Sequence, residues 1–180
     1  MKISQENIFP TTIRRFEFNN DEISPLLDEV FKNKKNIKKN SFFYSVNHYE
    51  NYYTDFKKPT KLREYEMLMN LIANQFHSKG FNFVLGDYWT AIYGKNSAHN
   101  THNHKSINYN FSSILYLTNG GSTSFISSNN TSGEKTYLEM AEVGKLIIFP
   151  SSLWHYVTYN ESSERIIISS NIRILGNEIT

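Results

Sequence analysis

The pattern of hydrophobic and polar positions changes character near residue 81. Before that point, two segments repeat their apolar residues at intervals of three and four, which is the period of an amphipathic helix. After it, short runs rich in Val, Ile, Tyr and Phe are separated by clusters of Gly, Asn and Ser, which is typical of strands and turns. Helices first and strands later, without alternation, argue against a doubly wound sheet.

The two helical segments are residues 21–35 and 59–80. In the first, Asp21 or Ser24 is the expected cap and Pro25 falls early in the first turn. In the second, apolar side chains line one face, and Gly80 is expected to stop the helix. We therefore expect residues 1–80 to be mostly helical support.

Seven β-prone runs follow, at residues 81–93, 111–117, 122–127, 135–140, 144–150, 154–159 and 164–175. Many short strands at regular spacing indicate a sandwich or a barrel. A chain of 180 residues suits one domain with a substantial core. The sequence thus predicts a single domain, residues 1–180, of the α+β class and mainly β, in which residues 81–180 form the core and carry the functional site.

Composition excludes several kinds of site and partner. The chain has no cysteine, which excludes disulfides, zinc–thiolate sites, iron–sulfur ligation and cysteine nucleophiles. A net charge of +2 is too small to favour nucleic acid as a partner. No apolar run approaches a membrane span, and the first residues lack the apolar core of a signal peptide. We expect a cytoplasmic protein with no membrane partner.

Two of the six histidines, His102 and His104, are one residue apart. Residues i and i+2 of a strand point to the same side, so both imidazoles can bind one metal ion. His155, on a later strand, would supply a third nitrogen. Three ligands with open positions describe a catalytic site, and imidazole suits iron, copper, zinc and nickel.

The other three histidines are weaker candidates. His99 and His102 have a spacing that also binds metal on a turn, which is a minority alternative. His48 and His77 are expected to be ordinary surface or core residues.

Arg165 is the candidate for binding an anion beside that metal. If a hairpin centres on Asn160, His155 and Arg165 lie directly opposite one another and face the same cavity. A guanidinium is the natural partner for a carboxylate. An α-keto acid that chelates the metal through its keto and carboxylate oxygens would then place its far carboxylate on Arg165.

The order of these motifs resembles the iron(II)/2-oxoglutarate-dependent oxygenases, in the branch common in phage and marine bacterial genomes. The shared motifs are H-x-H at 102–104, G-x-L-x-x-F-P-S-x-x-x-H at 144–155, a preceding tryptophan strand at 88–90 and R-x-x-x-S-x-N at 165–171. The resemblance implies a double-stranded β-helix (jelly roll) with supporting N-terminal helices. It also implies Fe(II) bound by His102 and His155, and 2-oxoglutarate bound by Arg165.

Departures from the family pattern leave alternatives open. Most such oxygenases use H-x-D or H-x-E, but the last aspartate here is Asp87. The third ligand is therefore His104, a distant glutamate or water. Ile167 stands where a hydroxyl is expected two residues after the arginine. Tyr116 is the best candidate for a phenol that meets the 2-oxoglutarate carboxylate, although a core role competes with this one.

Several inward positions have both a functional and a structural interpretation. Trp89, Tyr93 and Tyr109 either line the cosubstrate pocket or fill the barrel core, and the core is the better expectation. Asn171 has the parity of Arg165, so it faces the cavity or has a structural role.

We therefore expect an iron(II)/2-oxoglutarate-dependent dioxygenase that hydroxylates a substrate and releases succinate and carbon dioxide. Its partners would be this small-molecule cosubstrate and a substrate that ranges, on the sequence alone, from protein side chains to nucleobases and sugars. One alternative is a cupin-like three-histidine metalloenzyme that does not use 2-oxoglutarate. Another is a non-catalytic jelly roll with a structural or sugar-binding role, which would bind no metal.

Overall fold

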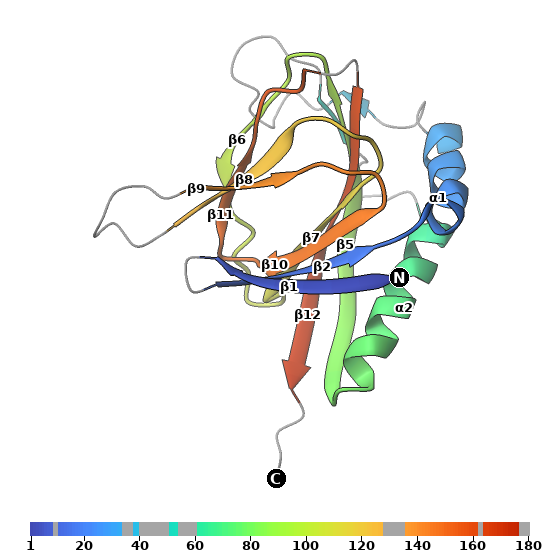
Figure 1. Cartoon of the computed structure of the whole chain (residues 1–180), viewed down its shortest axis with the longest axis vertical. Helices are drawn as coiled ribbons and strands as arrows, with labels where there is room; N and C mark the ends of the chain where they lie inside the picture. Colours follow the sequence, from blue (N-terminus) through green and yellow to red (C-terminus); the bar gives the residue numbers. More distant parts are fainter. Residues whose placement is uncertain are drawn as a thin grey trace.

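In the described part of the chain, two antiparallel sheets pack face to face, and two helices cover the outside of the larger sheet (Figure 1). The computed structural model describes residues 1–8, 11–33, 38–39, 51–53, 61–127, 136–161 and 164–176. Within these residues the larger sheet has eight strands and the smaller sheet has four.

Each sheet joins strands from distant parts of the chain. In spatial order, the larger sheet contains β1 (Lys2–Ile8), β2 (Thr11–Glu17), β10 (Lys145–Pro150), β7 (Phe111–Tyr116), β12 (Glu164–Gly176), β5 (Phe81–Gly94), β4 (Asn51–Tyr53) and β3 (Lys38–Lys39). The smaller sheet contains β6 (His99–His102), β11 (Trp154–Val157), β8 (Ser122–Ile126) and β9 (Thr136–Met140), again in spatial order.

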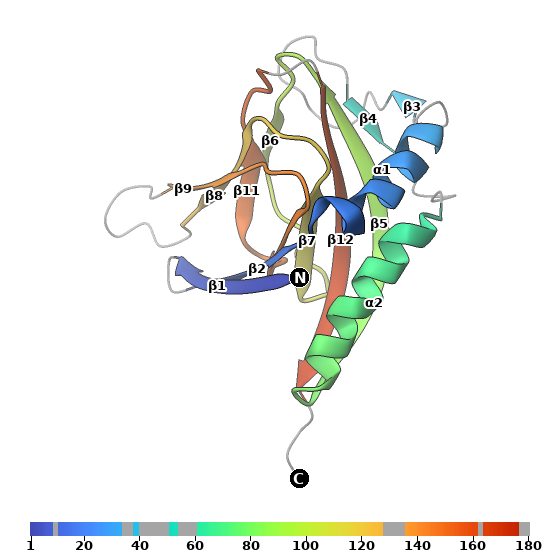
Figure 2. The same cartoon turned by 45° about the vertical axis from the view of Figure 1, so that its right-hand side comes forward.

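The helices α1 (Asn20–Asn33) and α2 (Arg63–His77) pack on the outer face of the larger sheet, as Figure 2 shows from the side. Alternation along β12 divides its side chains between two cores. Ile166 and Ile168 pack under the helices, whereas Ile167 points toward the smaller sheet. No helix within the described ranges combines the length and the hydropathy needed to cross a membrane.

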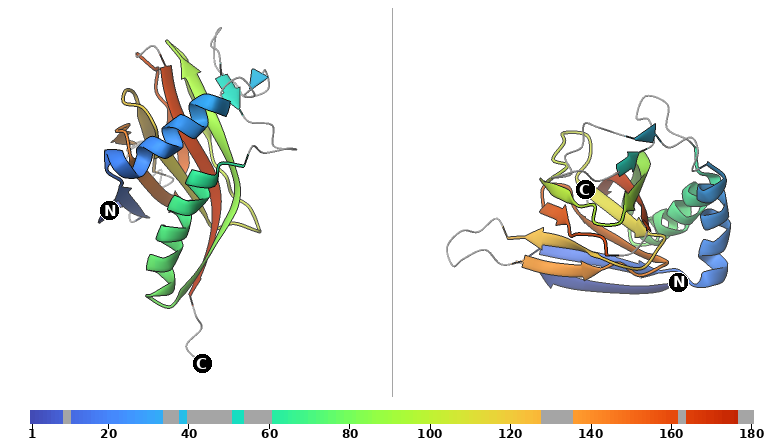
Figure 3. Two further views of the ribbon diagram at one scale, coloured as in Figure 1. Left: turned by 90° about the vertical axis from the view of Figure 1, so that its right-hand side faces the viewer. Right: turned by 90° about the horizontal axis from the view of Figure 1, so that it is seen from above.

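A second core lies between the two sheets, and it is unusually aromatic. Its buried members include Tyr93, Tyr116, Phe125 and Phe149. The view from above in Figure 3 shows the two sheets stacked, with the helices on one side only. This inner core surrounds the candidate site and fixes the strands that carry it.

The predicted fold class is confirmed: the described residues are mainly β, with two helices, and form the packed antiparallel sheets of a double-stranded β-helix. All seven predicted strands are present, although their ends differ by a few residues. The expectation of mostly helical support before residue 81 needs correction, because β1 and β2 form a hairpin that extends the larger sheet beside β10. The short strand β6 is also an addition to the prediction, because its sequence HNTH has no apolar residue.

The start of α1 also differs from the prediction. The cap is Asn19, whose Oδ1 accepts a hydrogen bond from Glu22 N at 3.0 Å, while Glu22 Oε2 accepts one from Asn19 N at 2.9 Å. This reciprocal capping box begins the helix earlier than Asp21 or Ser24 would. Gly80 ends the α2 segment as predicted, with a φ of 79° that favours glycine.

Candidate metal centre

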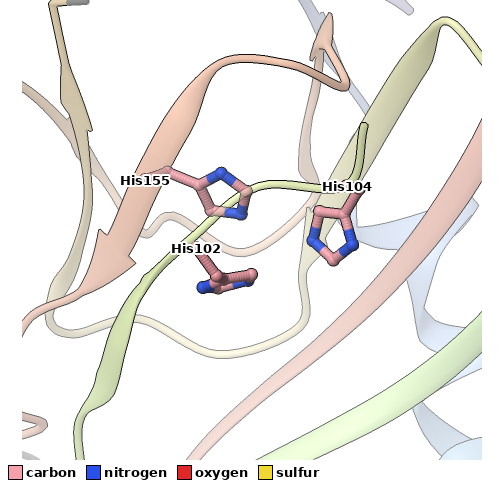
Figure 4. Close-up of side chains that lie close together, drawn as sticks. All are labelled: His102, His104 and His155. Atoms are coloured by element: carbon pink, nitrogen blue, oxygen red, sulfur yellow. The ribbon is translucent and has the colours of Figure 1, made fainter. Parts of the chain in front are cut away.

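Three imidazoles converge at one end of the space between the sheets (Figure 4). His102 on β6 and His155 on β11 are direct cross-strand partners, with ring centroids 4.3 Å apart. His104 follows two residues after β6, and its backbone N–H donates to Ser151 O at 2.8 Å. One ring nitrogen of each histidine lies within 4.8 Å of the other two. The sequence-predicted ligands His102, His104 and His155 are thus brought together.

Hydrogen bonds to carbonyl groups orient two of these rings. His102 Nδ1 lies 2.7 Å from Asn100 O, and His155 Nδ1 lies 3.0 Å from Leu153 O. A carbonyl oxygen can only accept, so each Nδ1 carries the proton and each Nε2 presents a lone pair. Metal-binding histidines usually have such a partner behind the ring. The two rings are therefore in the tautomer that a metal ion needs.

Electrostatics keep the cluster uncharged. Burial lowers the pKa of His155 well below its usual value, and it lowers that of His104 to about 4, with a further effect of His102 in both cases. Burial also lowers the pKa of His102. Neutral imidazole is the form that binds metal. Among the described residues, no carboxylate belongs to the cluster, so a divalent ion here would keep its charge uncompensated by the protein.

His99 supports the cluster without joining it. Its ring stacks on that of His102 at a centroid distance of 4.2 Å, and its Nδ1 lies 3.3 Å from the Tyr93 hydroxyl. His77 lies elsewhere, on α2, where its Nε2 accepts a hydrogen bond from Phe83 N at 3.3 Å. His48 lies outside the described residues. The expectation of an ordinary role is met for His77.

A cavity of about 160 Å³ opens beside the histidines, about ten times the space that one water needs. Its walls come from both sheets and include many polar groups. They are formed by Asp87, Trp89, Tyr93, His99, His102, His104, Ser112, Ser113, Ile114, Phe149, His155, Val157, Ile167, Ser169, Ser170 and Asn171. A small organic molecule therefore fits next to the candidate metal.

The predicted pairing of His155 with Arg165 is wrong. The two residues belong to different sheets, because β11 pairs with β6 and β8 while β12 pairs with β5 and β7. The chain crosses from one sheet to the other after β11 instead of turning back beside it. The inward direction of Arg165 is nevertheless correct, since Arg165 is fully buried between the sheets.

Arg165 is held by the smaller sheet, although it belongs to the larger one. Its Nη1 donates to Ser122 O at 3.0 Å and its Nη2 donates to Thr123 Oγ1 at 3.2 Å. Its Nε has no acceptor, and none of the ion pairs found within the described residues includes this guanidinium. Arg165 is not itself part of the cavity wall, but its cross-strand partner Tyr93 is.

Tyr116 lies directly against Arg165. The guanidinium carbon is 5.5 Å from the Tyr116 ring centroid, and the phenol donates to Thr123 Oγ1 at 2.8 Å. Burial raises the pKa of Tyr116 to about 12, so the phenol stays protonated. Trp89 and Tyr93 are both core residues and cavity walls, whereas Tyr109 is not among the lining residues.

Sequence reasoning assigned none of the polar wall residues Asp87, Ser113 and Ser170 to the site. It also missed Ser112 and left Asn171 undecided. The two are cross-strand partners on the inner face, and both line the cavity. Alternation along the strand could have found Ser112, because it lies two and four residues before Ile114 and Tyr116 and therefore faces the same inner side. An apolar residue is the norm at such a position.

Comparison with known proteins agrees with this geometry. Residues 87–171 match the family model described as "Putative 2OG-Fe(II) oxygenase". This segment contains all three histidines and Arg165. Comparison with curated proteins gave no match.

Several solved structures have the same fold at low sequence identity. A prolyl-4-hydroxylase from Pseudomonas putida superposes with a TM-score of 0.64 and 15% identity, covering 89% of this chain and 91% of that one. A prolyl hydroxylase from Trichoplax adhaerens, in complex with a hypoxia inducible factor peptide fragment, has a TM-score of 0.64 and 11% identity. The match covers 88% of this chain and 82% of that one. The viral collagen prolyl hydroxylase of Paramecium Bursaria Chlorella virus-1, in its 2OG complex, has a TM-score of 0.57 and 16% identity. The match covers 89% of this chain and 94% of that one.

Proposed function

We propose that this chain, in which residues 87–171 match the 2OG-Fe(II) oxygenase family model, hydroxylates a C–H bond of a substrate and releases succinate and carbon dioxide. The protein is an oxidoreductase whose cofactors are Fe(II) and 2-oxoglutarate. In this proposal His102, His104 and His155 hold the iron. Arg165 binds the far carboxylate of 2-oxoglutarate, next to Tyr116.

The observation that carries the proposal is that Arg165 has no acidic partner in the part of the chain that the structure describes. A fully buried cation without an acidic partner is costly unless something compensates it. Two neutral acceptors, Ser122 O and Thr123 Oγ1, hold the guanidinium in place without neutralising it. A ligand carboxylate would provide the missing negative charge and an acceptor for the free Nε.

Strand β8 sets the spacing between this cation and the histidines. Thr123, which anchors Arg165, is two residues from Phe125, and Phe125 is the cross-strand partner of His155. Two residues of a strand span about 7 Å. A short dicarboxylate that chelates a metal at the histidines therefore has the length to place its other end near Arg165.

The donor set fits Fe(II). Imidazole nitrogens bind iron well, and three protein ligands leave open positions for other molecules. When bound, the iron and 2-oxoglutarate together supply the activation of dioxygen that the hydroxylation requires. The protein's own residues orient the ligands: carbonyl groups fix the tautomers of His102 and His155, and Phe125 and Phe149 keep water from one side of His155.

The decisive experiment measures thermal stability with metal and 2-oxoglutarate. In the presence of Mn(II), 2-oxoglutarate should raise the melting temperature of the wild type, because a ligand that binds only the folded state stabilises it. Arg165→Ala should abolish this increase. Arg173→Ala is the matched control, because Arg173 lies on the same strand but is exposed.

Two other outcomes would decide against the proposal. Metal binding with no response to 2-oxoglutarate in any variant would favour a three-histidine metalloenzyme of another kind. An equal response in Arg165→Ala and wild type would remove Arg165 from the cosubstrate site.

With Fe(II) and oxygen, succinate formation by the wild type should exceed that of Arg165→Ala.

A further inference from the structure

The cavity extends along the inner face of the larger sheet to a polar end that neither the metal site nor the cosubstrate site uses. Inward positions of β12 follow one another from Arg165 through Ile167 and Ser169 to Asn171. Six residues of strand span about 20 Å. Asn171 therefore lies at the opposite end of this face from the proposed cosubstrate carboxylate.

Two buried polar atoms at this end have no hydrogen-bond partner among the described residues. Asn171 is directly opposite Ser112 on β7, and both Asn171 Oδ1 and Ser112 Oγ are buried with no hydrogen bond. The side chain of Ser112 is only 2% exposed. Such groups are costly in a folded protein and call for an explanation.

The neighbouring pair on the same two strands shows that this is specific to the inner face. Ser113 and Ser170 are also cross-strand partners and also line the cavity, but their hydroxyls meet on the side of α2. Their hydroxyls lie 2.6 Å apart, and Ser113 Oγ lies 3.5 Å from the Tyr65 hydroxyl. These two serines thus satisfy each other, whereas the inward Ser112 and Asn171 are left open to the cavity.

The same end of the cavity has a negative charge at its exposed rim, because the pairing of β12 with β5 brings Asp87 close to Asn171 in register. Asp87, on β5, is the one acidic side chain among the described residues that line the cavity, and no lysine or arginine lines it. Trp89 is the next inward residue on that strand and also lines the cavity. The face of a tryptophan attracts cations. The unpaired atoms are acceptors or hydroxyls, so this end favours a hydrogen-bond donor with positive charge.

We propose that Ser112, Asn171 and Asp87 form the substrate subsite and that they bind an ammonium group of a small amine substrate. This inference rests on the proposed oxygenase function. An ammonium has three donors and no acceptor, which matches three oxygens of different residues. Trp89 links the two regions, because its ring centroid is 5.6 Å from that of His104. A substrate held by its amine therefore extends past Trp89 toward the metal.

The subsite can be tested with n-butylammonium as the probe and butanoate and butanol as its oppositely charged and uncharged analogues. The Zn(II)-loaded protein with 2-oxoglutarate is titrated while the indole N–H signals are followed by NMR. The chain has two tryptophans, and they report differently: Trp89 lines the cavity, whereas Trp154 is 44% exposed and does not line it. Butylammonium should shift the Trp89 signal and leave Trp154 unchanged.

Substitutions then assign the contacts. Asn171→Ala and Ser112→Ala should each weaken butylammonium binding by about tenfold, as expected for one hydrogen bond to a charged group. Asn171→Asp should strengthen it. Asn108→Ala is the control, because Asn108 is exposed and is not among the lining residues. Binding of butanoate or butanol as strong as that of butylammonium, or unchanged affinity in both alanine variants, would overturn the proposal.

Failure of the subsite and failure of the oxygenase function give different results. The same samples are tested for stabilisation by 2-oxoglutarate. If 2-oxoglutarate stabilises the protein in an Arg165-dependent way but no amine binds, the subsite is wrong and the oxygenase function stands. If butylammonium binds through Asn171 but 2-oxoglutarate has no effect, the amine subsite stands and the oxygenase function is wrong.

Discussion

His102 and His155 are direct cross-strand partners on β6 and β11, with their ring centroids 4.3 Å apart, although they are distant in sequence. Because β6 is at the edge of the smaller sheet, this pair is also where the edge strand is attached. A metal ion bound by both rings would join the two strands. Metal binding should therefore stabilise the fold as well as supply chemistry.

Removing one of the three histidines should cost most of the metal affinity. His155→Ala should weaken Co(II) binding by more than about 100-fold, because even residues behind a ligand typically contribute 10–100-fold. Isothermal titration calorimetry measures this directly. His77→Gln, on α2, should bind Co(II) like the wild type, and equal affinities in the two variants would refute the assigned ligands.

Replacing Arg165 by methionine should stabilise the cofactor-free protein while abolishing 2-oxoglutarate binding. The substitution removes a buried charge that has no acidic partner within the described ranges. Both hydrogen-bond acceptors keep other donors: Thr158 for Ser122 O and Tyr116 for Thr123 Oγ1. The free energy of unfolding should rise by about 1 kcal/mol or more in urea titrations. A decrease of that size would mean that the guanidinium stabilises the fold.

Glu139 should be important for stability, because it joins the two sheets. Its buried carboxylate on β9 contacts Arg15 of β2 at 2.6 Å and Lys145 of β10 at 2.9 Å. Glu139→Ala leaves two largely buried cations with weaker partners and should cost about 3 kcal/mol of unfolding free energy. Glu142→Ala is the control: Glu142 also contacts Lys145 but is 68% exposed, and should cost under about 1 kcal/mol.

The stability of the metal-free protein should fall as the pH falls below about 6.5. Burial lowers the pKa of His99 to about 3 and that of His104 to about 4. Between about pH 6.5 and 4 the unfolded chain binds protons at these histidines and the folded chain does not. Above about pH 6.5 neither state binds them, so this contribution is then fully retained.

Melting temperatures at pH 7.5, 6.0 and 5.0 test this dependence. Each such histidine contributes a slope of at most about 1.4 kcal/mol per pH unit. His99→Gln should flatten the curve, because it removes one of the groups that gain a proton on unfolding. Identical slopes in His99→Gln and wild type would show that His99 is not kept neutral by the fold.

Alternation along a strand predicts which face of the sheet a side chain lies on better than it predicts the cross-strand partner of that residue. The inward direction of Arg165 is predictable, because it follows from the neighbours Ile166 and Ile168, which face the helices. The predicted pairing of Arg165 with His155 is wrong, because pairing depends on which sheet the chain enters after β11. That choice is made by contacts with β5 and β7, which no local pattern encodes.

The cluster of three histidines is predictable from the sequence, whereas the polar end of the cavity is not. His102, His104 and His155 are residue types with few structural roles in such a pattern, so their chemistry is visible in the chain. Ser112 is ordinary on a strand, and only the fold shows that its hydroxyl lacks a partner. The β1–β2 hairpin escapes prediction for a related reason: its edge strand is polar and mostly exposed.

The anchoring of Arg165 on β8 has a consequence for the choice of keto acid. Arg165 donates a hydrogen bond to Thr123, and His155 is the cross-strand partner of Phe125, so strand β8 fixes the positions of both residues. Neither can move toward the other without breaking the smaller sheet. With Arg165 as the proposed partner of the far carboxylate, we expect oxaloacetate, one carbon shorter, and 2-oxoadipate, one carbon longer, to bind more weakly than 2-oxoglutarate. Strand β8 would therefore set the length of the keto acid that the site accepts.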